Sequence, residues 1–252
     1  MTLPDAPGAA APPWMIDLPL AHRGLHDEDR PENSLPAFEA AARAGYGVEL
    51  DVQLSKDGHP VVIHDTTLGR VADDGRRVAS LTAEELAEIG LVGSEHGVPT
   101  LAEALKILTD VPVMVEVKSS RLRPGALERE VAALVQDHPG PICVASFNPV
   151  VLRWFRRRYP DTIRVLTATS QGLSGFTAPL LRRLADLRDL PSVSPAAVSY
   201  DLQGLPHPAV DAWRRIGGTV IAWTVATEAA AERAATVADN IIFERIRPQI
   251  PA

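Results

Sequence analysis

Short apolar runs alternate with longer amphipathic stretches along most of this chain. Each run is almost continuously apolar or β-branched, which is typical of strands that are buried on both faces, as in parallel sheets. The pattern predicts nine strands, at Leu18–His22, Gly47–Val52, Val61–His64, Val113–Val117, Ile142–Ser146, Ile163–Thr167, Ala197–Tyr200, Val220–Val225 and Ile241–Phe243.

Helix signals lie between these strands. Polar capping residues and capping boxes precede amphipathic stretches, and prolines and glycines end them. The predicted helix starts and spans are Asn33-Ser34, Thr82–Glu85, Thr100–Glu103, Asn148-Pro149 up to Pro160, His207–Arg215 and Thr227–Ala238. Because strands and helices alternate, we expect a parallel α/β fold.

The second and third strands form an exception. They are joined by Gln53–Pro60, which is shorter than the dozen or so residues that a parallel crossover needs, and Asp57-Gly58 is a turn signal. An antiparallel hairpin therefore leaves eight parallel strands, and one interval between them is about twice as long as the others. The sequence predicts an α/β protein with a (β/α)8 TIM barrel and a small insertion after the second strand, at about 54–99.

Length and composition restrict the domain organisation, the partners and the location that we expect for this protein. The chain has 252 residues, close to the size of one such barrel, and we expect a mobile N-terminal tail at 1–15 and a single TIM-barrel domain at 16–252. The net charge of −7 argues against nucleic acid as a partner. No apolar run approaches the ~20 residues that span a bilayer, so we expect no stable membrane insertion. A lone Cys143 excludes an internal disulfide and favours a cytoplasmic location, while the oligomeric state stays open.

Acidic residues interrupt two of the predicted strands. Glu49 and Asp51 are two positions apart and share one face, and Glu116 and Lys118 repeat this spacing. The C-terminal ends of barrel strands meet at one rim, so these carboxylates should converge. A divalent cation would relieve their repulsion, and oxygen ligands favour Mg²⁺, Ca²⁺ or Mn²⁺ over Zn²⁺. Alternatively, Arg23 and Lys118 neutralise the acids in buried ion pairs.

Two histidines end strands at the same predicted rim. His22 ends the first strand and His64 ends the hairpin strand. Imidazole titrates near neutral pH and is the commonest general acid or base. Two histidines beside three acids and two basic residues therefore indicate acid–base chemistry on an anionic substrate.

An ordered set of short motifs, spread over about 18–248, resembles the glycerophosphodiester phosphodiesterase family. The motifs are His22-Arg23-Gly24, Pro31-Glu32-Asn33-Ser34 with Phe38, Glu49-Leu50-Asp51-Val52, Lys56-Asp57-Gly58, Val61-Val62-Ile63-His64-Asp65, Pro99-Thr100-Leu101 with Glu103, Glu116-Val117-Lys118, Ser146-Phe147 and Trp223-Thr224-Val225. The resemblance implies a TIM barrel with a small insertion after the second strand.

The resemblance also implies an activity. Glu49, Asp51 and Glu116 would hold one divalent cation, and His22 and His64 would act as base and acid, in an order that the sequence leaves open. The substrate would be a small glycerophosphodiester, hydrolysed to glycerol 3-phosphate and an alcohol. In this family the glycerol 2-hydroxyl is thought to attack first, through a cyclic phosphate.

Five further residues are candidates for substrate binding. Arg23 would bind a phosphate oxygen and Lys118 would add a positive charge, unless they serve only in ion pairs. Asn33 would form a hydrogen bond near the metal or the phosphate, or simply cap a helix. Phe147 and Trp223 would wall the glycerol, or pack in the core.

Two other functions stay open. A lysophospholipase D or phospholipase C-like enzyme would use the same barrel on a lipid phosphodiester, although the charged insertion argues against this substrate. A non-catalytic barrel that binds glycerol phosphate is the alternative from a different class, and the filled metal and histidine positions argue against it.

Overall fold

The computed structural model describes residues 10–119, 123–172 and 177–250. The chain divides into two compact units. The first is Leu20–Cys143, and the second combines Met1–Pro19 with Val144–Ala252. We refer to them as the first unit and the second unit.

Strands and helices alternate in both units. The first unit contains β1 (Leu20–His22), α2 (Leu35–Arg43), β2 (Gly47–Leu54), β3 (Pro60–Val62), the 3-10 helix η1 (Val78–Ser80), α3 (Ala83–Glu88), α4 (Leu101–Ile107), β4 (Val113–Val117) and α5 (Ala126–Asp137), and β5 (Ile142–Ser146) runs from it into the second unit. The second unit contains α1 (Trp14–Asp17), α6 (Pro149–Arg158), β6 (Arg164–Ala168), α7 (Ala178–Ala185), α8 (Leu190–Val193), β7 (Ala197–Asp201), the 3-10 helix η2 (Leu202–Gly204), α9 (Pro208–Arg215), β8 (Thr219–Val225), α10 (Glu228–Val237) and β9 (Asn240–Phe243).

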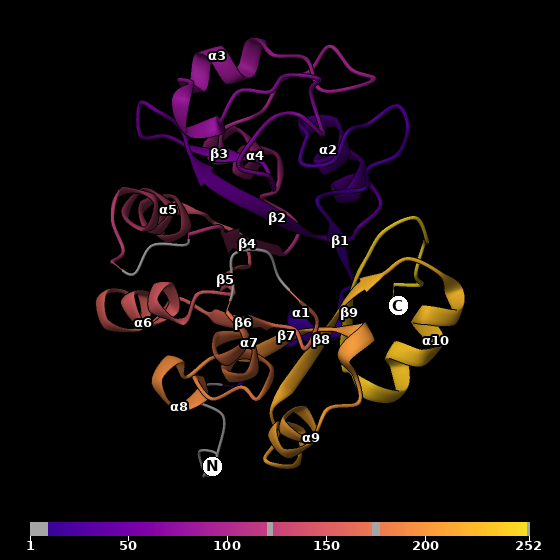
Figure 1. Cartoon of the computed structure of the whole chain (residues 1–252). Coiled ribbons are helices and arrows are strands. Elements are labelled where there is room, and N and C mark those ends of the chain that lie inside the picture. Colours follow the sequence, from indigo (N-terminus) through magenta and orange to yellow (C-terminus); the bar gives the residue numbers. More distant parts are fainter. Residues whose placement is uncertain (1–9, 120–122, 173–176, 251–252) are drawn as a thin grey trace. The chain divides into compact units, whose positions relative to one another are not determined.

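The nine strands have the order β1-β9-β8-β7-β6-β5-β4-β2-β3, and β1 also pairs with β2. Eight of them form the closed parallel barrel of a TIM fold, while β3 is bonded outside it. Figure 1 shows helices following the strands in each unit. The predicted fold class is therefore confirmed.

The predicted hairpin is also confirmed. Strand β3 runs antiparallel to β2, with Val52 opposite Val62 and Leu54 opposite Pro60. Gly58 in the connecting turn has a φ of +89°, a left-handed conformation that glycine adopts without steric cost. The hairpin directs the chain out of the barrel, and the insertion follows.

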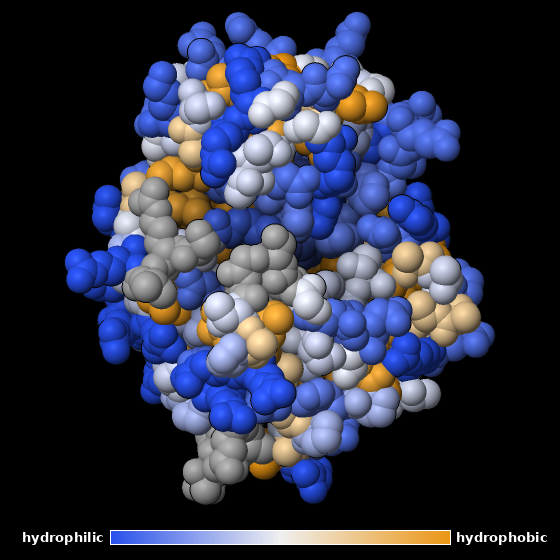
Figure 2. Space-filling view, in the orientation of Figure 1, coloured by the Kyte–Doolittle hydropathy of each residue, from blue (hydrophilic) through white to orange (hydrophobic). Residues whose placement is uncertain are grey.

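The insertion has an apolar cluster of its own. Nine buried residues form it: Val61, Ile63, Leu68, Val71, Val78, Leu81, Leu86, Leu91 and Val98. The predicted capping box at Thr82 begins α3, where the Thr82 hydroxyl accepts from Glu85 N and the Glu85 carboxylate accepts from Thr82 N. The outer face of the insertion is mostly hydrophilic, as the part of Figure 2 over α3 shows.

Truncating Leu86 should unfold or loosen this insertion. Leu86 is fully buried in the cluster, and Leu→Ala at such sites costs about 2–5 kcal/mol. We expect Leu86→Ala to lower the melting temperature in thermal unfolding. Val92, 61% exposed in the same segment, is the matched control, and Val92→Ala should leave stability within about 0.5 kcal/mol. Equal effects of the two substitutions would contradict a separate core in the insertion.

Four helices were not predicted. Helix α1 starts within the segment expected to be a tail, because Met15 is fully buried there, while residues 1–9 of that segment lie outside the described residues. Helix α5 follows Gly125, which has no capping side chain, and its first turn is held by Glu128, whose carboxylate accepts from Gly125 N. Helices α7 and α8 also lack a side-chain cap. The sequence signal is weak at α5, whereas α7 and α8 have Thr177 and Asp189 at their N-caps and a proline in the first turn, signals that the prediction did not use.

None of the helices in the described part of the chain combines the length and the hydropathy that a bilayer crossing requires.

Candidate active site

Three neighbouring strands of the first unit bring its functional side chains to one rim. In the parallel pairing of β1 with β2, His22 lies opposite Glu49. In the pairing of β2 with β4, Asp51 lies opposite Glu116. The three carboxylates are buried, and each offers a ligand atom within 4.8 Å of those of the others. The predicted convergence of the acids is therefore present.

Asp51 is the centre of this cluster. Its carboxylate lies 3.1 Å from Lys118 Nζ and 3.2 Å from Arg23 Nε, and it accepts a hydrogen bond of 3.1 Å from Asn33 Nδ2. Burial alone would raise the pKa of Asp51, but the charges of Lys118 and Arg23 outweigh burial and hold that pKa well below its usual range. Asp51 is therefore a fully ionised, well-partnered carboxylate.

Lys118 serves two acids. Its ammonium group also donates to Glu116 at 2.8 Å. Burial would lower the pKa of Lys118, but the charges of Asp51 and Glu116 raise it above its usual value. The buried ion pairs that the sequence left as an alternative are thus present within the acidic cluster.

Glu49 is the acid that these cations do not neutralise. Burial raises its pKa well above the usual value, and the charges of Asp51 and Glu116 raise it further, more than Arg23 and Lys118 lower it. Three acids face two cations, so in the absence of a further cation the protonated form of Glu49 is favoured. A cation bound among these carboxylates would favour its ionised form.

The donor set fits a hard divalent cation. Glu49, Asp51 and Glu116 offer only carboxylate oxygens, which suit Mg²⁺, Ca²⁺ and Mn²⁺. Ca²⁺–oxygen distances are about 2.3–2.6 Å, so two oxygens on one ion lie no more than about 5 Å apart. The 4.8 Å spread of the ligand atoms is within this limit.

The turn after β1 is tightly constrained. Arg23 has a φ of +57°, a conformation that side-chain-bearing residues seldom adopt, and its N–H points at Glu49 Oε2 at 3.3 Å. Gly24 follows with a φ of +82°, where a Cβ would lie 2.9 Å from the backbone of Ala37. This turn directs the Arg23 side chain at Asp51. Such strain is typical of functional sites.

Asn33 contacts the acidic cluster and does not cap α2. Ser34 caps α2, since its hydroxyl accepts from Ala37 N at 3.4 Å. The Asn33 side chain instead donates to Asp51 Oδ2 and accepts from Asp51 N at 3.4 Å. The Asn33 side chain is therefore bonded within the acidic cluster, and its role toward a metal or a phosphate stays a prediction.

His64 follows β3 and is held from two sides. Gln53, two positions after Asp51 on β2, donates its side-chain amide to the backbone oxygens of His64 at 2.8 Å and Asp65 at 2.6 Å. The Asp65 carboxylate lies 2.6 Å from His64 Nδ1. Burial lowers the pKa of His64, and the charges of Lys118 and Arg23 lower it further against the opposing charge of Asp51.

Four partner residues were given no role from the sequence, although two of them, Glu32 and Asp65, stand in the motifs that carry the resemblance; the four are Glu32, Gln53, Asp65 and Arg70. Gln53 had a usable signal, because it continues the two-residue spacing of Glu49 and Asp51 on one strand face. Asp65 directly follows His64. Arg70 had no local signal, since it lies among the charged residues of the insertion.

Phe147 and Trp223 belong to the second unit. Their rings pack edge to face with centroids 5.6 Å apart. The Trp223 indole N–H is buried and has no hydrogen-bond partner among the residues that the structure describes. The two rings therefore form an aromatic contact within the second unit, and the indole N–H of Trp223 is free to donate a hydrogen bond.

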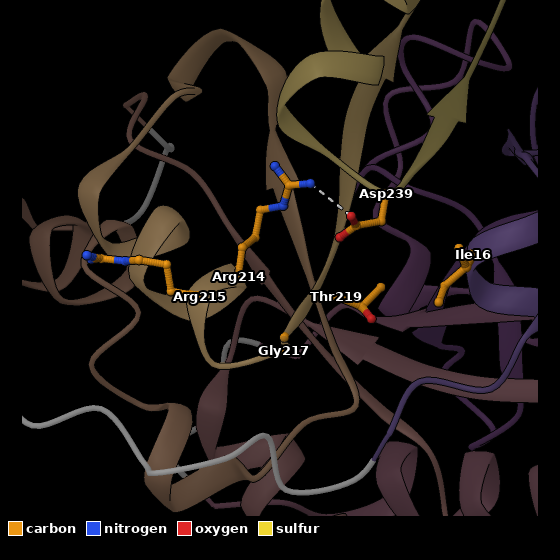
Figure 3. A pocket seen from close by; sticks show the side chains of 7 residues that line it. Ile16, Arg214, Arg215, Gly217, Thr219 and Asp239 are labelled. Atoms are coloured by element: carbon orange, nitrogen blue, oxygen red, sulfur yellow. Dashed lines mark hydrogen bonds and ion pairs between the residues drawn. The ribbon is translucent and has the colours of Figure 1, made fainter.

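A cavity of about 470 Å³ also lies in the second unit (Figure 3). Arg214 reaches across it to Asp239 at 3.0 Å, whereas Arg215 points away. Ile16, Gly217, Gly218 and Thr219 complete its lining. It contains none of the predicted site residues, and its one ion pair is already satisfied, so the acidic cluster is the better candidate for an active site.

The fold and the acidic cluster define a TIM-barrel protein whose strand ends carry a buried acidic triad that could hold a metal ion. Residues 22–246 match the Glycerophosphoryl diester phosphodiesterase family, and the chain belongs to this family.

Two relatives illustrate the similarity. The chain is 36% identical to the glycerophosphodiester phosphodiesterase of Caldanaerobacter subterraneus subsp. tengcongensis, over 58% of this chain and 64% of the relative. It is 32% identical to glycerophosphodiester phosphodiesterase 1 of Homo sapiens, over 62% of this chain and 50% of the relative. The chain thus spans between half and two thirds of the length of these relatives.

Solved structures share the fold. A phosphodiesterase of Oleispira antarctica, solved in complex with the product sn-glycerol-3-phosphate, has a TM-score of 0.75 and 22% identity, covering 91% of this chain and 93% of that one. A glycerophosphodiester phosphodiesterase of Thermotoga maritima has a TM-score of 0.68 and 24% identity, covering 89% and 92%.

Proposed function

We propose that this protein hydrolyses glycerophosphodiesters to glycerol 3-phosphate and an alcohol. The observation that carries the proposal is the buried set of Glu49, Asp51 and Glu116 with Arg23 and Lys118 bound among them. Membership of the family and the glycerol phosphate product bound by the Oleispira relative support the same substrate class.

One divalent cation, Mg²⁺ or Ca²⁺ with Mn²⁺ as a third candidate, would be held by Glu49, Asp51 and Glu116. When bound, it would stabilise negative charge on the phosphate and acidify a nearby hydroxyl. Arg23 would bind a phosphate oxygen through its planar donors, and Lys118 would add a positive charge at the same anion. Asn33 keeps Asp51 oriented through its two hydrogen bonds.

His22 and His64 would move the protons. One would remove the proton of the glycerol 2-hydroxyl as its oxygen bonds to phosphorus, and the other would donate a proton to the oxygen of the leaving alcohol as its P–O bond breaks. A water would then open the resulting cyclic phosphate, with the two proton transfers reversed, to give glycerol 3-phosphate. His64 is oriented for this work by Asp65 and Gln53. That Phe147 and Trp223 wall the glycerol stays a prediction from the sequence.

The test is a substrate panel. We expect glycerophosphocholine and glycerophosphoethanolamine to be hydrolysed with Mg²⁺, Ca²⁺ or Mn²⁺, and activity to be lost with a chelator and restored by adding the cation. Lysophospholipids assayed beside them separate a lipid phosphodiesterase from the proposed enzyme. Full activity after chelation would refute the metal requirement. No turnover of any diester, together with tight binding of glycerol phosphate by calorimetry, would instead indicate a binding protein.

The cytoplasmic location and the single domain at 16–252 stay predictions.

A further inference from the structure

Arg70, in the insertion, binds two carboxylates at once. Its Nε donates to Asp65 Oδ2 at 2.6 Å. Its Nη1 and Nη2 donate to the two oxygens of Glu32 at 2.7 and 2.8 Å. Three nitrogens of one planar group therefore hold two acids that are far apart in the sequence, which is a geometry that lysine cannot reproduce.

The first of these acids, Asp65, contacts His64. Arg70 occupies Asp65 Oδ2, while the other oxygen, Oδ1, lies 2.6 Å from His64 Nδ1. An ionised carboxylate can only accept, so Nδ1 carries the proton and donates to Asp65. With both oxygens of Asp65 engaged, the carboxylate cannot rotate freely, and the imidazole ring is held in one orientation.

The second acid, Glu32, is connected to the acidic cluster through Arg23. Glu32 Oε1 accepts a hydrogen bond of 2.7 Å from Arg23 Nη1 as well as the one from Arg70. Arg23 in turn lies 3.2 Å from Asp51 through its Nε. Burial alone would raise the pKa of Glu32, but the hydrogen bonds and charges of Arg70 and Arg23 lower it to about 2, so Glu32 keeps its charge.

An ordinary surface ion pair would have little consequence, since such pairs contribute about 0–1 kcal/mol. Arg76 supplies the comparison within the same insertion. It is about as exposed as Arg70, at 55% against 49%, and its side chain binds Asp74, two positions away in the sequence, with no other ion-pair partner in the described part of the chain. Arg70 differs because both of its partners contact side chains that the proposed mechanism uses.

We propose that Arg70 is a positioning residue that locks His64 and Arg23 into one arrangement through Asp65 and Glu32. This inference rests on the proposed function for its catalytic consequence, but not for the arrangement itself. The insertion thus contributes to the arrangement of the site through Arg70, which directly precedes Val71 of the apolar cluster.

Steady-state kinetics test whether the positioning role of Arg70 affects catalysis. In the full-length protein we expect Arg70→Ala to lower kcat for glycerophosphocholine about 10- to 100-fold, the usual effect of losing a supporting residue, with KM changed less than about threefold. Millimolar methylguanidinium should restore part of this loss, because it can occupy the vacated site. Arg70→Lys should stay below the wild type, and Arg76→Ala should equal it. An unchanged kcat in Arg70→Ala, or an equal loss in Arg76→Ala, would overturn the proposal.

A second measurement does not need turnover. In ¹⁵N spectra of histidine-labelled protein, assigned with a His64→Gln variant, wild type and Arg76→Ala should both show His64 protonated at Nδ1. Arg70→Ala should shift the His64 signals toward a mixture of tautomers, and methylguanidinium should reverse that shift. An identical His64 spectrum in Arg70→Ala overturns the positioning role. If His64 responds but the wild type hydrolyses no diester, the proposed function fails and the positioning role stands.

Discussion

Glu49→Gln should abolish the response of this protein to divalent cations and at the same time stabilise the metal-free protein. Burial and the charges of Asp51 and Glu116 raise the pKa of Glu49, so its ionised form is disfavoured unless a cation is bound. Glutamine keeps an oxygen to accept from Arg23 N but removes the charge. We expect kcat/KM to fall by at least about 10²–10³, the usual loss of one electrostatic stabiliser.

Thermal unfolding separates the two effects of Glu49→Gln. In chelator, its melting temperature should exceed that of the wild type by about 2–4 °C, which corresponds to about 1 kcal/mol for a chain of this size. With added Mg²⁺, Ca²⁺ or Mn²⁺, only the wild type should gain stability. Glu39→Gln, at an exposed ion pair of α2, is the control and should behave as the wild type does. Equal cation-induced stabilisation of Glu49→Gln and the wild type would refute the metal assignment.

The same substitution has a pH signature. Because the pKa of Glu49 is raised in the folded protein, its contribution to stability is complete below its unfolded value of about 4.5 and is lost as pH rises through the folded pKa. In chelator, the advantage of Glu49→Gln over the wild type should therefore be small at pH 4 and grow toward higher pH. A difference that shrinks with rising pH would contradict the raised pKa.

Replacing either His22 or His64 by alanine should lower kcat by about 10²–10⁴, the usual contribution of a placed acid or base. Both histidines lie at the rim of the first unit, His22 opposite Glu49 and His64 against Asp65. Neither histidine is a proposed ligand of the cation. Both variants should therefore keep the rise in melting temperature that the cation causes in the wild type. If this rise is kept, the loss of activity comes from lost proton transfer and not from lost cation binding.

His59 is the matched control for the histidine variants. It lies in the hairpin turn with a side chain 64% exposed, so His59→Ala should retain wild-type kcat. Steady-state kinetics with glycerophosphocholine at saturating cation measure all three variants. Wild-type rates in both His22→Ala and His64→Ala would refute the two-histidine mechanism.

Much of the fold could be read from local patterns. The continuous apolar runs predicted all nine strands, and the short connection at Asp57-Gly58 predicted the antiparallel hairpin. The capping boxes at Thr82 and Thr100 begin α3 and α4 as expected. These features are local, because a strand period, a turn and a helix cap each depend on a few adjacent residues. Helices without a capping side chain, such as α5, left no comparable signal.

The candidate site was predictable where strand geometry alone brings residues together. The two-residue spacing puts Glu49 and Asp51 on one face, and parallel pairing aligns Asp51 with Glu116, so the acidic cluster follows from the sequence and the fold class.

The sequence by itself determined the barrel, the insertion and the identity of the acids and histidines. Only the tertiary structure decided how charge is distributed among them. Asp51 is neutralised while Glu49 is not, because Arg23 and Lys118 both reach Asp51 across the rim. Likewise, Arg70 meets Glu32, 38 positions away, only because the insertion folds its own apolar cluster beside the strand ends. Such contacts between distant residues depend on side-chain geometry in three dimensions, which no spacing along the chain encodes.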